Sequence, residues 1–233
     1  VIIEGNTVKD VFAEGIRVYH SSTLTGTFNI INNEVINAGI NPGSARNAIS
    51  LVGLVGNGQC SGIGSVLIKG NTITSGEGWG IQLDAENGCV TQNTISEKGS
   101  GIYVYGPGYS EGQSNNNIIS NNVISFTGYG ISIVGSGNTI DSNTVTSSIG
   151  RGFNFDSRSQ NNIITNNVAN NNNNYGFYFN DESKGHTFTG NTATGNGIAD
   201  IEGFSTGPVG PFTISSSGGD CLTIGTWNQG TKT

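Results

Sequence analysis

The sequence predicts an all-β chain wound as a parallel β-helix, a solenoid of about eight coils, because one unit recurs along it. The clearest copy spans Asn161 to Asn180 and contains two landmarks. The first is an Asn followed by a variable and then an apolar or small residue, as in Asn167-Val168-Ala169. The second follows nine residues later and is a Gly that begins an alternation of aromatic and variable residues, Gly176 to Phe179. Alternation with a period of two is typical of a half-buried strand.

The Asn landmark sets the period of the repeat. Successive copies lie 27, 38, 22, 29, 21, 24 and 24 residues apart, so a basic period of 21 to 24 residues carries insertions in some copies. A period of this size is typical of a solenoid. Leucine-rich repeats share it, but they need regular Leu and usually a helical segment, whereas Asn and Gly interrupt this sequence every few residues. The eight copies begin at Asn6, Asn33, Asn71, Asn93, Asn122, Asn143, Asn167 and Asn191.

Stacking of the coils, about 4.8 Å apart, would place equivalent residues above one another. The repeated Asn is then expected at a bend, where its amide bonds the equivalent Asn one coil away and its backbone adopts the left-handed conformation. The strand that begins at the repeated Gly is called the Gly strand. Its apolar positions are expected to form two buried files. One file is Ile16, Ile49, Ile81, Ile102, Ile131, Phe153 and Phe177, and the other is Val18, Leu51, Leu83, Val104, Ile133, Phe155 and Phe179.

A single solenoid accounts for most of the chain, so we expect one β-helix over residues 1–204 and a C-terminal tail, not part of the repeat, over 205–233. The tail contains two strand-like runs, Phe212 to Ile214 and Cys221 to Trp227, and would cap the solenoid or exchange a strand with a neighbour. Residues 1–18 already make a complete coil without a polar cap. An open strand edge of this kind predicts either further chain before Val1 or a second subunit that covers it.

Composition narrows the classes of partner. The net charge of −7, with only nine Lys and Arg, argues against nucleic acid, whose phosphates are bound by clustered basic residues. No apolar stretch reaches the roughly 20 residues that a membrane-spanning helix needs. No spacing of ligand residues predicts a metal site, so no cofactor is expected. The chain contains no Met and begins without a signal peptide, and is interpreted as a processed or excised segment.

The three cysteines suggest an oxidising compartment. Cys60 and Cys89 fall near the same corner of successive coils, so a disulfide between them is expected, which suits a secreted or cell-surface protein. Cys221 is then left either as a free buried thiol or as a link to another chain. His186, at a coil corner, is expected to be solvated.

Insertions gather after the Gly strand, around His20 to Thr25, Gly53 to Gly64 and Gly106 to Ser114, and one more, Ala38 to Arg46, precedes it. Insertions on one side of a solenoid usually build its binding face. The outward files of the same strand add aromatic rings beside carboxylates, amides and Arg, which suit the ring faces and hydroxyls of a sugar chain. The candidate binding residues are Arg17, Tyr19, His20, Gln82, Tyr103, Tyr105, Asn154, Asp156 and Tyr178.

Two sets of residues are candidates for catalysis. Asp84 and Glu86 would lie about 7 Å apart on one face of a strand, a separation suited to an inverting glycosidase. Asp84 and Asp156 are three coils apart, roughly 14 Å, which is too far. Arg17, Tyr19 and His20 are acid and base candidates of the kind that lyases use.

The Asn-x-Val/Ile unit followed by Gly-Ile-x-Leu resembles the right-handed parallel β-helix repeats of carbohydrate-binding and sugar-hydrolase domains, over roughly residues 1–201. The resemblance implies export and action on polysaccharides by lyases, hydrolases or epimerases, although adhesins, phage tailspikes and surface-layer proteins share the repeat. The polygalacturonase motifs Asn-Thr-Asp, Gly-His-Gly and Arg-Ile-Lys are absent, so no catalytic residue is carried over.

The sequence therefore favours an exported, right-handed, single-stranded β-helix that interacts with polysaccharide, and leaves open whether it also cleaves it as a lyase or glycoside hydrolase. The alternative is a structural protein of a cell surface, sheath or filament. In that case copies of the chain would stack end to end.

Overall fold

The computed structural model describes residues 1–40, 46–105 and 114–203, and in these residues the chain forms three parallel sheets of eight strands each. Sheet A consists of β1 (Ile2–Glu4), β4 (Phe28–Ile31), β7 (Val66–Lys69), β10 (Cys89–Thr91), β13 (Ile118–Ser120), β16 (Thr139–Asp141), β19 (Ile163–Thr165) and β22 (Thr187–Thr189). Sheet B consists of β2 (Thr7–Val11), β5 (Glu34–Ala38), β8 (Thr72–Thr74), β11 (Thr94–Ser96), β14 (Val123–Ser125), β17 (Thr144–Thr146), β20 (Val168–Asn170) and β23 (Thr192–Thr194). Sheet C consists of β3 (Ile16–Thr25), β6 (Ile49–Val55), β9 (Trp79–Glu86), β12 (Ser100–Val104), β15 (Ile131–Ile133), β18 (Phe153–Phe155), β21 (Tyr175–Phe179) and β24 (Ala199–Glu202).

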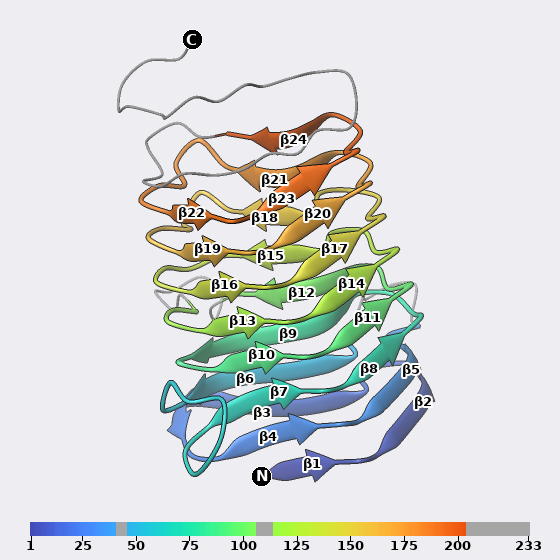
Figure 1. Ribbon diagram of the computed structural model, residues 1–233. Coiled ribbons are helices and arrows are strands. Elements are labelled where there is room, and N and C mark those ends of the chain that lie inside the picture. The colour runs from blue at the N-terminus through green and yellow to red at the C-terminus, as the bar shows by residue number, and fades with distance from the viewer. Residues whose placement is uncertain (41–45, 106–113, 204–233) are drawn as a thin grey trace.

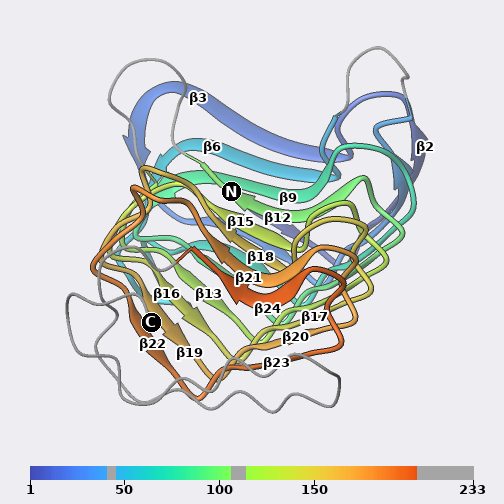
Figure 2. The same cartoon turned by 90° about the horizontal axis from the view of Figure 1, so that it is seen from above.

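Each coil contributes one strand to each sheet, and strands that pair within a sheet come from successive coils (Figure 1). Viewed down the axis, the three sheets surround a common interior (Figure 2), which one cluster of buried apolar side chains fills. The predicted all-β fold and solenoid architecture are confirmed. The Gly strand of the repeat is the strand of sheet C, whereas the Asn landmark lies at the corner where sheet A turns into sheet B.

The core consists of inward rows that follow the predicted register. Sheet C pairs Ile81 with Ile102 and Leu83 with Val104, and the rows continue to the phenylalanines of β18 and β21. Phe153 stacks on Phe177, and Phe155 stacks on Phe179, each with ring centroids 4.6 Å apart. Both predicted files are buried, except that Val18 is only partly covered. Burial of each such side chain stabilises the fold by roughly 1.5 to 3 kcal/mol.

The Asn landmarks form the predicted hydrogen-bonded ladder. The backbone N–H and the Nδ2 of Asn93 both donate to Oδ1 of Asn122, at 3.0 Å each, and Asn122 bonds Asn143 in the same way. The prediction that these residues adopt the left-handed conformation is wrong. The residue before each landmark has the positive φ instead, for example Gln92 at 57° and Asn121 at 55°, so it makes the corner while the Asn fastens it to the next coil.

A second ladder, at the corner that leads into sheet A, was not predicted. It runs from Asn117 through Asn138 to Asn162, whose backbone N–H donates to Nδ1 of His186 at 3.2 Å. His186 is therefore buried, and its predicted solvation is wrong. Its Nε2 lies 2.6 Å from Oγ of Ser183, and burial lowers its pKa to about 4. Because Nδ1 accepts, the neutral ring carries its proton on Nε2 and ends the ladder as a satisfied structural group.

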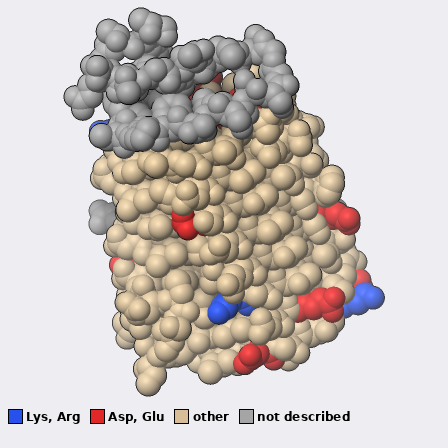
Figure 3. Space-filling model, viewed as in Figure 1, with Lys and Arg blue, Asp and Glu red and all other residues tan. Residues whose placement is uncertain are grey.

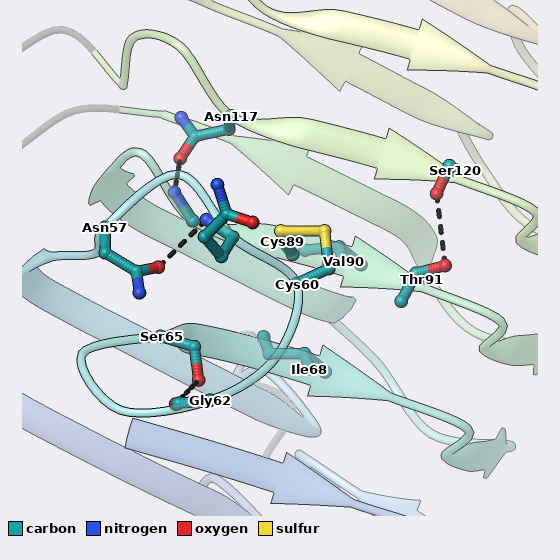
Figure 4. The surroundings of a disulfide bond; sticks show 12 residues. Asn57, Cys60, Gly62, Ser65, Ile68, Cys89, Val90, Thr91, Asn117 and Ser120 are labelled. Atoms are coloured by element: carbon teal, nitrogen blue, oxygen red, sulfur yellow. Dashed lines mark hydrogen bonds between the residues drawn. A yellow bond between two sulfur atoms is a disulfide. The ribbon is translucent and has the colours of Figure 1, made fainter. Parts of the chain in front are cut away.

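Cys60 and Cys89 form the predicted disulfide, with Cα atoms 5.5 Å apart (Figure 4). Cys89 lies on β10, so the bond fastens the loop of residues 56–64 against the outer side of sheet A. Leu67 and Cys89, which occupy an outward row of that sheet, are accordingly buried.

The expectation that the insertion at Gly53 to Gly64 flanks the outer face of sheet C is wrong. The insertion at His20 to Thr25 instead prolongs β3, and residues 106–113 lie outside the described part of the chain.

The predicted tail, residues 205–233, with Cys221, lies outside the described residues, so capping and end-to-end assembly stay predictions. In residues 1–40, 46–105 and 114–203, no helix has the length and apolarity needed to cross a bilayer.

Candidate functional site on the outer face of sheet C

The outer face of sheet C carries three parallel rows of side chains, of which the sequence predicted two. The middle row is Arg17, Ser50, Gln82, Tyr103, Ser132, Asn154 and Tyr178. The following row is Tyr19, Val52, Asp84, Tyr105, Val134, Asp156 and Asn180, in which the last four continue the parallel backbone bonding beyond the strand ends. The row that was missed precedes the repeated Gly and contains Glu14, Asn47, Trp79, Ser100, Tyr129, Arg151 and Tyr175.

Sheet C differs in chemistry from the other sheets. The outward rows of sheet B are mainly hydroxyl and aliphatic residues, such as Thr72, Thr94 and Thr144 in one row and Thr74, Ser96 and Thr146 in the other. Figure 3, which views sheets A and B from outside, shows few charged side chains on that side of the molecule. Stacked Trp and Tyr rings, an Arg that lies over a Tyr ring, and Arg–carboxylate ion pairs lie together on the outer face of sheet C.

An aromatic stack crosses the middle of this face. The ring of Tyr103 lies between Trp79 and Tyr105, with centroid distances of 4.6 Å and 5.0 Å and interplanar angles of 18° and 16°. The guanidinium carbon of Arg158 lies 5.7 Å from the ring centroid of Tyr105. Because neighbours cover both faces of Tyr103, that residue offers only its hydroxyl edge. The outer rings, Trp79 and Tyr105, are partly exposed and present that surface to an apolar ligand, with Arg158 beside the ring of Tyr105.

The electrostatic surroundings of Tyr103 hold its hydroxyl in the protonated form. Burial first, and then the nearby Tyr105 and Asp156, raise its pKa to about 12, against the opposing effect of Arg158. Asp156 itself is bound by Arg158, whose Nε lies 3.4 Å from the carboxylate. Tyr103 is therefore a hydrogen-bond donor at neutral pH, as a group that recognises sugar hydroxyls requires.

Asp84 occupies an outward position of β9 but is only 3% exposed, whereas Glu86, two residues further along, is exposed. Asp84 therefore occupies the outward position that was predicted, but its side chain is buried. Burial raises the pKa of its carboxyl group to about 7. Within the part of the chain that the structure describes, no hydrogen bond or ion pair reaches this carboxyl group. Such a group retains a proton close to neutral pH, which is the property required of a general acid.

Replacement of Asp84 by Asn is expected to stabilise the protein at about pH 8 but not at about pH 4. The unfolded carboxyl loses its proton near its ordinary pKa of 3.8, whereas the folded one keeps it up to about 7. Wild-type stability should therefore fall as the pH rises through this interval, and the amide cannot ionise. Thermal melts across the interval should show a gain of about 2 kcal/mol for the variant at the alkaline end. Identical pH profiles for both proteins would refute the burial of this carboxyl group.

The remaining predicted residues fall into separate clusters. In the first coil, Arg17 bonds Glu14 at 2.8 Å and lies 4.8 Å from the ring centroid of Tyr19, which is 57% exposed. His20 follows on the same strand, two coils away from Asp84. In the second and third coils, Nδ2 of Asn47 donates to Gln82. The aromatic stack therefore lies apart from the three candidates for lyase chemistry, Arg17, Tyr19 and His20.

A second cluster forms around Arg151 in the sixth coil. Its guanidinium carbon lies 3.5 Å from the ring centroid of Tyr178 and 5.9 Å from that of Tyr175. Its Nη1 donates to Oδ1 of Asn154 at 2.6 Å. Asn154 and Tyr178 were predicted as binding residues, but Arg151 and Tyr175 were not. Both residues could have been predicted from the sequence, because each stands directly before a repeated Gly. That position adds one outward residue to the strand.

No group of three or more His, Cys, Asp or Glu side chains gathers as a metal site in the described ranges 1–40, 46–105 and 114–203.

The sequence model of the protein family described as the right-handed β-helix region matches residues 52–219, so the chain belongs to this family. Among solved structures, a double mutant of the periplasmic alginate epimerase AlgG matches with a TM-score of 0.56 and 14% identity, over 81% of this chain and 50% of the epimerase chain. A double mutant of the tailspike protein of E. coli bacteriophage HK620 matches with a TM-score of 0.52 and 12% identity, over 92% of this chain and 40% of the tailspike chain. This chain thus spans half or less of their length. No curated protein matches the sequence.

Proposed function

We propose that the protein is exported and binds polysaccharide along the outer face of sheet C. The observation that carries the proposal is the stack of Trp79, Tyr103 and Tyr105 beside a buried carboxyl group and an ordered Arg. The exposed parts of Trp79 and Tyr105 suit the apolar faces of pyranose rings, and hydrogen-bonding groups on both sides of the stack suit their hydroxyls. The disulfide between Cys60 and Cys89 agrees with an oxidising compartment.

The shape of the site suits a chain more than a single sugar. The polar rows run parallel to the helix axis, and coils repeat about every 4.8 Å, so the clusters of the first, fourth and sixth coils span roughly 24 Å. The solved structures of similar fold are named for an alginate epimerase and a phage tailspike. At their low identity they establish the fold alone, and the proposal depends on the side chains of this chain.

If the face also cleaves its ligand, Asp84 is the candidate proton donor, although ligand binding would first have to expose its buried side chain. Its raised pKa keeps the acid form available, and the alternation of β9 places the exposed Glu86 on the same side as a candidate base. Two carboxyl groups in unlike surroundings are the arrangement that glycoside hydrolysis requires.

Binding is tested with a broad oligosaccharide array followed by titration of the ligands found. Replacement of Trp79 or Tyr105 by Ala is expected to weaken binding roughly tenfold or more, because each removes an outer ring of the stack and its apolar contact area. Thr144→Ala, on the outer face of sheet B, is the matched control and should bind as the wild type does. Melting temperatures show whether each variant is folded. A wild-type protein that binds no glycan, or a control that loses as much affinity as the ring variants, would refute the proposal.

A further inference from the structure

Arg151 is held in one orientation by its own surroundings. The guanidinium carbon lies over the ring of Tyr178, 3.5 Å from its centroid, and Nη1 donates a hydrogen bond to Oδ1 of Asn154. Asn154 is fixed in turn, because its Nδ2 donates to Oγ of Ser132 at 2.9 Å. Arg151 is half-buried, so its position is set by packing as well as by hydrogen bonds. An Arg side chain has about 2 kcal/mol of rotamer entropy to lose on binding, and much of that loss has already occurred here.

Arg151 also differs from two other arginines of this face, Arg17 in the first coil and Arg158 in its own coil. Arg17 bonds the carboxylate of Glu14 and Arg158 bonds that of Asp156. No carboxylate of the described residues reaches Arg151. A guanidinium has five N–H donors, and Asn154 accepts one bond. The remaining donors lie in the guanidinium plane, and donors of this kind form the fork that binds carboxylate and sulfate with two hydrogen bonds.

We infer that Arg151, with Tyr175, Tyr178 and Asn154, is a subsite for an anionic group on a sugar, either the carboxylate of a uronic acid or a sulfate ester. The inference depends on the proposed polysaccharide-binding function and names the class of its ligand, an acidic polysaccharide. The overall charge of −7 would repel such a chain. An ordered cation that no carboxylate of the described residues neutralises provides the local attraction that overcomes this repulsion, and a neutral sugar would not use its charge.

The test uses two pairs of oligosaccharides. One pair is a uronate oligomer and its methyl ester, and the other is a sulfated oligomer and its desulfated form. Within a pair the two sugars differ mainly in the charge of the anionic group. The wild type is expected to bind one acidic member about tenfold to a hundredfold more tightly than its neutral counterpart, since hydrogen bonds to a charged group make that difference. The pair that shows the difference identifies carboxylate or sulfate as the group bound.

Arg151→Gln removes the charge but keeps two N–H donors, and should abolish the preference by lowering the affinity for the acidic sugar far more than the affinity for its neutral counterpart. Arg151→Lys keeps the charge without the fork and should retain part of the preference. Lys9→Gln removes the same charge from sheet B and is the control, for which the wild-type preference is expected. Equal affinity of the wild type for both members of each pair would overturn the subsite and leave glycan binding intact. So would an equal loss for acidic and neutral sugars in Arg151→Gln, since Arg151 would then only position its neighbours.

Discussion

Replacement of Phe155 by Asp is expected to prevent folding. Phe155 is fully buried, stacks on Phe179 with 4.6 Å between ring centroids, and contacts the ring of His186. Removal of a buried Phe costs about 3 to 5 kcal/mol, and an unpaired buried charge costs several kcal/mol more. The sum is comparable to the whole stability of a typical domain, roughly 5 to 15 kcal/mol. The variant should be insoluble, or should lack the cooperative thermal transition of the wild type in circular dichroism.

Phe155→Leu is the matched control for this substitution. It stays apolar and removes only part of the ring volume, so a folded protein that is less stable by roughly 1 to 3 kcal/mol is expected. If Phe155→Asp were soluble and melted cooperatively, Phe155 would not lie in the core row, and the register of sheet C would be wrong.

The fold was predictable because the coil period and the inward alternation are properties of the sequence alone. The files that contain Ile81 and Leu83 follow from a period of two, and stacking then aligns equivalent residues of successive coils. The Asn ladder was predictable for the same reason. What the pattern could not reveal is which residue of a corner takes the left-handed conformation. Gln92 and Asn121 do so, next to landmarks whose side chains must point inward to bond the next coil.

The site was only partly predictable, because the direction of an outward residue does not determine its exposure. Asp84 and Glu86 alternate as expected, yet one is buried and the other is exposed. Stacking of Tyr103 between two rings, and of Arg151 on Tyr178, depends on side-chain rotamers across strands rather than on spacing along the chain. The insertion at residues 56–64 misled the prediction because its length is visible in the sequence but the side on which it folds is not.

Replacement of Asn122 by Ala is expected to cost about 3 to 6 kcal/mol, because several buried partners lose their bonds at once. Oδ1 of Asn122 accepts from the backbone N–H and from Nδ2 of Asn93, and its Nδ2 donates to the carbonyl of Val90 and to Oδ1 of Asn143. Each buried group left unsatisfied costs roughly 1 to 3 kcal/mol, whereas water can replace a bond at an exposed site.

Asn6→Ala is the control, because Asn6 is the exposed first residue of the ladder and its Nδ2 donates to Glu4 and Asn33 only. Denaturant titrations should give a loss below about 1 kcal/mol for that variant. If both variants lost the same stability, the buried Asn residues would act through local turn preference and not through the ladder of hydrogen bonds. Burial of their side chains would then not stabilise the stacking of the coils.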